Sequence, residues 1–238
     1  MYQATISADI IASSSLNIEE IDLITQRIYW LFEQINENQQ RLGKNKIFSR
    51  LVSGDHIECL LMDPCDALRV ALIIKNGIKS FPLYDLYEES ALKKSRKLFQ
   101  TYGVRVAIGI GEMNTELLEK NILNGDAINR SGRLLAQQKT SNKERAVIKN
   151  TLFFDSPIES QSNLFSVIMA LLDELLNKTT TKQSNILIFK LLGYTEMEIA
   201  QEFGITQSTV NQQSKAAGWN AIEQAVQYYF NFDFSKNS

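Results

Sequence analysis

Apolar residues alternate with polar or small ones over the first ten positions, and they recur at helical spacing over the next twenty. An alternating pattern is typical of a strand, and a 3.6-residue period is typical of an amphipathic helix. The pattern predicts strands at 3–10, 46–53, 56–61, 104–110 and 145–149, and helices at 17–39, 64–79, 86–101, 125–139 and 161–177. Up to residue 110 the order is βαββαβ with one extra helix before the last strand, which favours a ferredoxin-like core.

The last quarter of the chain has a purely helical pattern. Helices are predicted at 185–193, 196–203, 206–217 and 219–230. Thr195 and Glu198 have the spacing of a capping box, Gly204 is a helix stop, and Thr206 caps the next helix. Two short helices around such a tight turn resemble the helix-turn-helix of sigma factor region 4 and of response-regulator output modules.

A polar stretch at 177–184 separates these two patterns and is predicted to be a linker. The expected fold class is therefore α+β, with a ferredoxin-like domain over 1–178. A small all-α helix-turn-helix domain is expected over 179–238.

Composition narrows the class of protein. With 238 residues, of which 44% are hydrophobic, the chain can bury a substantial core. No apolar run is long enough for a membrane span and no secretion signal opens the chain, so we expect a cytoplasmic protein without membrane contact. The 25 basic and 27 acidic residues give no overall electrostatic attraction for nucleic acid.

Four polar residues have the types and positions that phosphate chemistry requires. Asp9 ends the first strand, and Asp55 lies in the predicted turn of a hairpin, so their carboxylates are expected to converge. Hard oxygen ligands of this kind suit Mg²⁺ or Mn²⁺. Asn129 and Arg133 are one turn apart on a predicted helix, where an amide and a guanidinium can hold one phosphate. The set predicts a phosphoryl-transfer site.

These residues occur within four motifs, which follow one another in the order 8–10, 54–55, 105–111 and 125–133. Together they resemble the signature of class III nucleotidyl cyclases. Ser7-Ala-Asp-Ile-Ile11, Ser53-Gly-Asp55 and Gly109-Ile-Gly-Glu-Met-Asn-Thr-Glu116 are most similar to the SatD family of bacterial proteins. The resemblance covers roughly residues 1 to 150, and a helix-turn-helix tail is known in SatD-like proteins.

The resemblance implies a role for each matched residue. Asp9 and Asp55 match the two metal-binding carboxylates, and Ile10 matches the residue whose carbonyl joins them. Asn129 and Arg133 match the catalytic pair that stabilises the transition state from the opposite subunit of a head-to-tail homodimer. The implied ligands are a nucleoside triphosphate and Mg²⁺ or Mn²⁺.

The chain departs from purine cyclases at the positions that read the base. Leu51 stands in place of a lysine and Ile122 in place of an acid, and neither can hydrogen-bond to a base edge. Lys143 and Lys149 are candidates for the late phosphate-binding lysine. The base is therefore not specified.

The second helix of the tail is expected to face the DNA major groove with six polar side chains, namely Thr206, Gln207, Ser208, Thr209, Asn211 and Gln212. Glutamine and asparagine can read adenine, and hydroxyl groups can bind phosphates. Residues 181–238 contain four lysines against five acids, so a single copy should bind DNA weakly. The same face would also suit a protein-docking module.

These observations favour a cytoplasmic transcriptional regulator that binds DNA through its tail and a nucleotide with metal through its cyclase-like domain. Two alternatives stay open: an active class III-type nucleotidyl cyclase that uses two divalent metals, and a non-catalytic protein-interaction scaffold. Each acid also has a structural interpretation, because Asp9 can cap a turn and Asp55 is a common turn residue.

Overall fold

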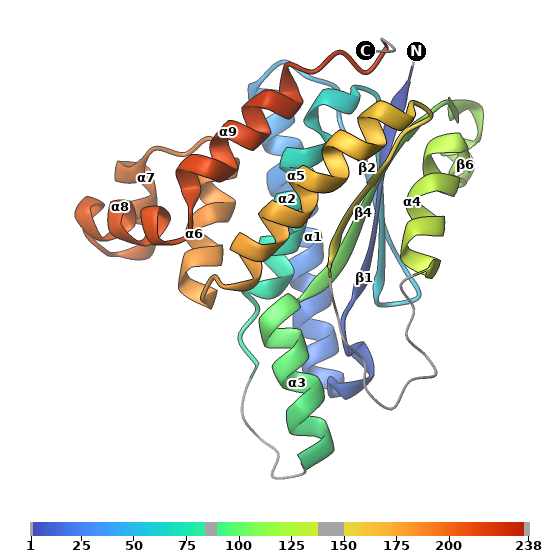
Figure 1. The fold of residues 1–238 in the computed structure, drawn as a ribbon. Helices are drawn as coiled ribbons and strands as arrows, with labels where there is room; N and C mark the ends of the chain where they lie inside the picture. The colour runs from blue at the N-terminus through green and yellow to red at the C-terminus, as the bar shows by residue number, and fades with distance from the viewer. Residues whose placement is uncertain (1, 84–89, 138–149, 236–238) are drawn as a thin grey trace.

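A five-stranded mixed sheet forms the centre of the residues that the computed structural model describes, which are 2–83, 90–137 and 150–235 (Figure 1). Its strands are β1 Gln3–Ile10, β2 Phe48–Val52, β3 His56–Leu61, β4 Val104–Gly111 and β7 Leu152–Asp155. The order across the sheet is β2-β3-β1-β4-β7. Strand β1 is antiparallel to both β3 and β4, whereas β7 is parallel to β4. Strand β1 is therefore the central strand of the sheet, with two strands on each side.

Helices cover both faces of this sheet (Figure 1). One face carries α1 Ile18–Arg41, α2 Ala67–Lys79 and α5 Glu159–Asn177, and the other carries α4 Asp126–Gln137. Helix α3 Ser90–Tyr102 leads into β4. A two-stranded ribbon of β5 Met113–Asn114 and β6 Asn124–Gly125 precedes α4, and the short 3-10 helices η1, η2 and η3 span Ser13–Ser15, Pro64–Asp66 and Thr115–Lys120.

The side chains of β1 are apolar on one face of the sheet and carry hydroxyl groups on the other. Ala4, Ile6 and Ala8 are fully buried in the apolar core beneath α1 and α2. Thr5 and Ser7, which point the opposite way, are equally buried and bond to α4. A strand that is covered on both faces explains why its polar positions are small hydroxyls rather than charges.

The tail of the chain packs onto the sheet layer through α6 Thr181–Leu191, which is followed by α7 Glu196–Phe203, α8 Gln207–Ala216 and α9 Trp219–Phe230. Helix α6 lies against α2. Asn38 of α1 donates to the carbonyl oxygen of Leu192 at 2.6 Å, and Arg27 donates to Asn185 at 2.9 Å. The tail is thus fixed to α1 by hydrogen bonds as well as by apolar contacts.

The predicted α+β class is confirmed, and the strands at 3–10, 56–61 and 104–110 match the structure closely. The stretch 177–184 is not a linker, because α6 begins at Thr181 and Ser184 is fully buried. The strand predicted at 145–149 lies outside the described residues, and β7 Leu152–Asp155 was not predicted. The division at residue 178 stays a prediction.

No helix in the described part of the chain combines the length and apolar character needed to cross a bilayer.

A buried ion pair connects α2 with α5. The ammonium of Lys75 lies 3.2 Å from a carboxylate oxygen of Asp173, and both side chains are almost completely buried. Thr151, just before β7, donates its hydroxyl to the same carboxylate. Burial lowers the pKa of Lys75, and Asp173 acts in the opposite direction. Because each charge depends on the other for compensation, the pair holds α5 in register with α2.

Replacing Asp173 tests this contribution. The variant Asp173→Ala leaves the Lys75 ammonium buried without its counter-ion, so we expect the free energy of unfolding to fall by about 3–5 kcal/mol. Denaturant titration followed by circular dichroism measures the change. Glu174→Ala, at the neighbouring exposed position of the same helix, should change it by less than about 1 kcal/mol. Equal losses in the two variants would contradict this role.

Candidate functional site

The two predicted carboxylates come from adjoining positions at one end of the sheet. Asp9 is the register partner of His56, the first residue of β3, and the N–H of Ile10 donates to the carbonyl oxygen of Asp55 at 3.0 Å. The hairpin turns through Ser53 and Gly54, both with positive φ, so that Asp55 lies directly before β3. The pairing of β1 with β3 therefore brings the backbones of Asp9, Ile10 and Asp55 together.

Each carboxylate has a polar neighbour. Asp9 accepts from a guanidinium nitrogen of Arg105 at 3.4 Å across the β1–β4 pair, and its side chain is 21% exposed. Asp55 accepts from the hydroxyl of Ser13 at 2.9 Å. Sequence reasoning missed Arg105 and Ser13, because only strand register and the turn after β1 bring them to these acids.

The donor set at this end is a pair of acids rather than a closed metal cage. Among the residues that the structure describes, no three His, Cys, Asp or Glu side chains are grouped to hold a metal ion. Two carboxylates and the carbonyl of Ile10 are hard oxygen donors, which fit Mg²⁺ or Mn²⁺ with the other positions taken by water or phosphate oxygens.

The turn that follows β1 offers backbone N–H groups beside these acids. Ala12 adopts the left-handed conformation, at φ 58° and ψ 31°, and the 3-10 turn Ser13–Ser15 follows it. The N–H groups of Ile10, Ile11, Ser15 and Leu16 bond to carbonyls, while those of residues 12–14 have no acceptor within the described part of the chain. A left-handed residue followed by right-handed ones directs successive N–H groups inward, a concavity that binds anions.

Helix α4 approaches the sheet closely over two glycines of β4. A Cβ at Gly109 would lie 2.2 Å from the carbonyl oxygen of Ala127, and one at Gly111 would lie 2.6 Å from the carboxylate of Asp126. The close backbone approach predicted from these glycines is confirmed. Substitution at either position has to push α4 away from the sheet.

Buried hydroxyls fix the rotation of α4 about its axis. Ser131, on its inner face, lies 3.0 Å from the Thr5 hydroxyl and 2.8 Å from the Ser7 hydroxyl. All three side chains are fully buried, so each hydroxyl finds its partner within this cluster. The cluster determines which side of α4 meets β1.

With Ala127, Ser131 and Leu135 facing inward, the predicted pair Asn129 and Arg133 lies on the opposite side of α4. Both side chains are exposed and one helical turn apart, as expected. The structure thus brings the backbones of Asp9 and Asp55 together and places Asn129 beside Arg133, but it turns the second pair toward solvent rather than toward the sheet. Convergence of the two carboxylates on one cation stays a prediction.

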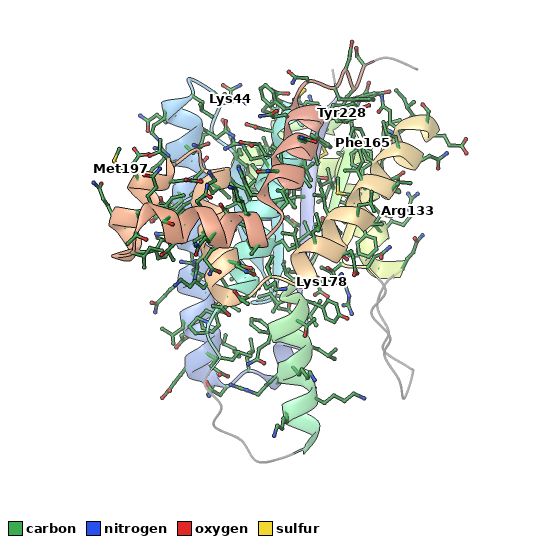
Figure 2. All side chains as sticks on the ribbon, turned by 60° about the vertical axis from the view of Figure 1, so that its left-hand side comes forward. Lys44, Arg133, Phe165, Lys178, Met197 and Tyr228 are labelled. Atoms are coloured by element: carbon green, nitrogen blue, oxygen red, sulfur yellow. The ribbon has the colours of Figure 1, made fainter. Side chains whose placement is uncertain are left out.

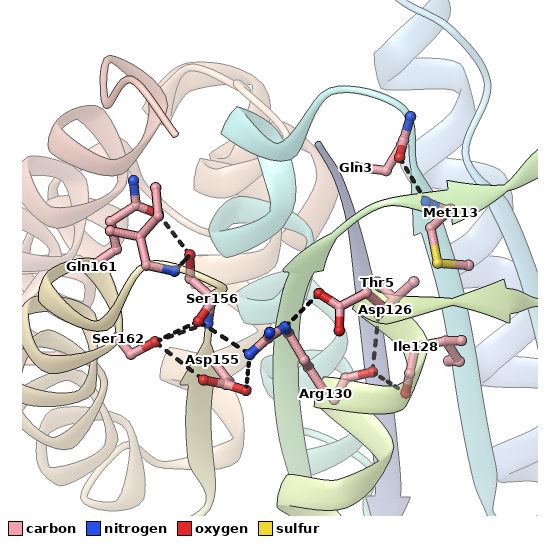
Figure 3. A network of polar contacts seen from close by, with 12 residues as sticks. Gln3, Thr5, Met113, Asp126, Ile128, Arg130, Asp155, Ser156, Gln161 and Ser162 are labelled. Atoms are coloured by element: carbon pink, nitrogen blue, oxygen red, sulfur yellow. Dashed lines mark hydrogen bonds and ion pairs between the residues drawn. The ribbon is translucent and has the colours of Figure 1, made fainter. Parts of the chain in front are cut away.

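Arg130, next to Asn129, is the most strongly held cation of α4 and was not singled out from the sequence (Figure 3). It donates to Asp126 at 2.7 Å, to Asp155 at 2.9 Å and to the carbonyl oxygen of Ser156 at 3.2 Å. Partial burial acts to lower its pKa, but the two carboxylates raise it. The spacing of Asp126 and Arg130 signals their pairing, whereas Asp155 is reached only through the fold.

The two positions that the resemblance matches to base-reading residues, Leu51 and Ile122, differ from each other in their surroundings. Leu51 packs against the apolar core, while Ile122 is 46% exposed. Nearby, Arg50 donates to Glu58 at 2.8 Å. Hydrogen bonds from His56 and Arg50 lower the pKa of Glu58, although burial acts in the opposite direction. Lys143 and Lys149, the candidates for a phosphate lysine, lie outside the described residues.

The helix caps and the helix stop predicted in the tail are confirmed. Thr195 and Glu198 form the capping box of α7, Gly204 ends that helix at φ 61°, and Thr206 caps α8. The predicted DNA-contacting residues Thr206, Gln207, Ser208 and Gln212 are exposed, and Thr209 and Asn211 are half-buried. Asn211 donates to Glu196 of α7, so its amide already has a partner inside the tail.

The close approach of α4 gives a direct test of the site's framework. Gly109→Ala should displace α4 and lower the free energy of unfolding by about 1–3 kcal/mol, because the new Cβ meets main-chain atoms. Gly132→Ala is the matched control, since a Cβ there meets nothing and alanine favours helix. Chemical denaturation measures both, and a stabilised Gly109→Ala would contradict the close contact.

Comparisons with known proteins give little beyond this geometry. No protein-family model matches the chain, and no curated protein matches it. Two solved structures of bacterial light-regulated adenylyl cyclases are similar to it, at 16% and 17% sequence identity and TM-scores of 0.37 and 0.34. The first match covers 65% of this chain and 43% of that one, and the second covers 64% and 74%. At such scores the likeness carries no inference about function.

Proposed function

We propose that the sheet domain is a class III cyclase-like, SatD-like module that binds a nucleoside triphosphate together with Mg²⁺ or Mn²⁺. The observation that carries this proposal is the placement of Asp9 and Asp55 at one sheet end, where the turn after β1 leaves the N–H groups of residues 12–14 without an acceptor among the described residues. The strand order β2-β3-β1-β4, reached through a βαββαβ path, also supports a ferredoxin-like core. The combination provides oxygen ligands for a cation and donors for a phosphate at the same place.

Each residue then has a chemical role. Asp9, Asp55 and the carbonyl of Ile10 would hold the divalent ions, which activate a ribose hydroxyl and neutralise phosphate charge. The N–H groups of residues 12–14 would bind phosphate oxygens. Ser13 orients the carboxylate of Asp55 by its hydrogen bond, and Arg105 offsets the charge of Asp9 while no cation is bound.

Catalysis would need a second copy of the chain. Asn129 and Arg133 face solvent on α4, so they serve a neighbouring copy's nucleotide more readily than their own. In a homodimer, the amide and the guanidinium would stabilise charge that develops on the phosphate in the transition state. We therefore favour an active nucleotidyl cyclase over the other hypotheses for this domain. If no nucleotide binds, the hypothesis of a non-catalytic interaction scaffold remains.

Nucleotide binding and turnover can be measured directly. With Mn²⁺ and each of the four common nucleoside triphosphates, calorimetry should detect binding to at least one, and chromatography should detect its cyclic product. Asp9→Asn and Asp55→Asn should each lower turnover by at least about 100-fold, because a cation ligand is lost. Asp22→Asn, at an exposed position of α1, is the control and should leave turnover unchanged.

The binding and turnover measurements together distinguish a cyclase from a nucleotide sensor and from a scaffold. Binding without a product, abolished by the same two substitutions, would support a nucleotide sensor. No binding of any triphosphate with Mn²⁺ would refute the nucleotide site and leave the scaffold.

The second candidate function is DNA contact by the tail as a helix-turn-helix, and the observation in its favour is the capped pair α7 and α8 with an exposed polar face on α8. Gln207 and Gln212 are exposed on that face. Within the described residues, neither side-chain amide forms a hydrogen bond to another part of the chain. The tail carries more acidic than basic residues, so such binding would depend on dimerisation. In this reading the nucleotide would regulate transcription.

A gel shift tests the DNA reading. At low salt, the full chain should shift DNA from upstream of its own gene, and Gln207→Ala or Gln212→Ala should weaken the complex by about 10-fold. Gln183→Ala, whose side chain caps α6, is a glutamine control outside α8. The complex should also weaken as salt rises, since phosphate contacts release counter-ions. If no shift is seen at low salt, DNA contact is excluded.

A further inference from the structure

Arg27 is a half-buried cation of α1, at the junction of the sheet layer with the tail, which lies alongside α1 in Figure 2. One terminal nitrogen of its guanidinium donates to Asn185 of α6 at 2.9 Å and to the hydroxyl of Ser80, just after α2, at 3.4 Å. The central carbon of the guanidinium lies 4.2 Å from the ring centroid of Trp30. Arg27 therefore joins α1, α2 and α6 through uncharged groups.

The lack of an acidic partner distinguishes Arg27 from the other arginines that are buried or half-buried. The described arginines of that kind that form an ion pair with a carboxylate at 3.4 Å or less are Arg50, Arg69, Arg96, Arg105 and Arg130. Arg27 has no such pair with any acid in the described part of the chain. Burial lowers the pKa of Arg27, but a guanidinium stays charged at physiological pH. The fold therefore withdraws a positive charge from water without compensating it.

A hollow of about 430 Å³ lies beside Arg27, where α1, the end of α2 and α6 meet. A volume of this size is typical of a site for a small molecule. Its apolar walls are Leu23, Trp30, Phe81 and Pro82. Its other described walls are uncharged and come from Gln26, Ser80 and Asn185. Within the described residues, Arg27 is thus the one charged group that lines the hollow.

The charge and the walls of this hollow determine which ligand fits. One guanidinium supplies one positive charge, and its planar fork matches the two oxygens of a carboxylate. Only one of its three nitrogens donates within the described residues, so donors remain for a ligand. A phosphate group carries up to two negative charges at neutral pH, more than this site offsets. The apolar walls require an apolar body on the same molecule.

We propose that this hollow binds a small monocarboxylate with an apolar or aromatic body, whose carboxylate pairs with Arg27 while its body lies against Leu23 and Phe81. Arg27 already holds Asn185 and Ser80, so the bound anion stabilises the packing of α6 against α1 and the end of α2. Neither Asp9 nor Asp55 lines the hollow, so this site is separate from the proposed nucleotide site.

Aromatic carboxylates test the site on the full chain. Among benzoate, phenylacetate and indole-3-acetate at about 5 mM, at least one should raise the midpoint of thermal unfolding by about 2 °C or more. The amide of the same acid has the same shape without the charge, and with sodium chloride added to match the ionic strength it should not. The proposal is overturned if no carboxylate raises the midpoint, if the amide raises it equally, or if phenyl phosphate raises it more.

Variants locate the binding at Arg27. Arg27→Gln should abolish the rise in midpoint, whereas Arg41→Gln should keep it, because Arg41 is exposed on the same helix and lies over the ring of Tyr194. Asn185→Asp places the chain's own carboxylate beside Arg27 with little change of shape, so it should also abolish the rise even if Arg27→Gln does not fold. A rise that persists in either variant would refute the site.

The chain's own acids are the competing partners of Arg27. Asp85, Glu88 and Glu89 lie in the segment 84–89, outside the described residues. Replacing all three with their amides should leave the affinity for the carboxylate unchanged in calorimetry, and a gain of about 10-fold would overturn the proposal, because the chain would then fill the site itself. Asp9→Asn should keep the rise in midpoint, and its loss would place the binding at the nucleotide site instead.

Discussion

The pairing of β1 on both of its edges is the constraint on which the rest of this structure depends. Hydrogen bonding to β3 brings Asp9 and Ile10 to Asp55, and hydrogen bonding to β4 brings Arg105 to Asp9. A shift of one residue in either register would turn these side chains to the other face of the sheet. The apolar half of β1 prevents such a shift, because Ile6 would then leave the core. The register of β1 that buries Ile6 in the core is therefore the same register that places Asp9 beside Arg105 and Ile10 beside Asp55.

Helix α4 shows how one helix serves both packing and chemistry. Its inner face meets the glycines of β4 and the hydroxyls of β1, where each buried hydroxyl has a partner. This contact fixes the rotation of the helix, and the rotation in turn leaves Asn129 and Arg133 exposed. Arg130 secures the same helix to Asp155 after β7. A rigid helix that exposes Asn129 and Arg133 in this way is better placed to contact a neighbouring molecule than its own sheet.

Helix α2 joins the sheet layer to the tail. It packs on β4 and β1, contacts α6 from the tail, and holds α5 through the buried pair of Lys75 and Asp173. A change at the sheet end therefore has a packed route to α6 and α5. If the sheet end binds a nucleotide as proposed, the same packed route would connect that site with α8 through α6.

The sequence by itself determined the features that depend on neighbours within about four residues. The strand periods at 3–10, 56–61 and 104–110, the capping box at Thr195, the stop at Gly204 and the need for a close approach at Gly109 all follow from local chemistry and were predicted correctly. Tertiary structure alone decided which residues far apart in the chain meet: Arg105 at Asp9, Asp155 at Arg130, and α6 against α2. The reason is physical, since local hydrogen bonds and sterics act over a few residues, whereas strand register and helix packing are set by the burial of the whole core.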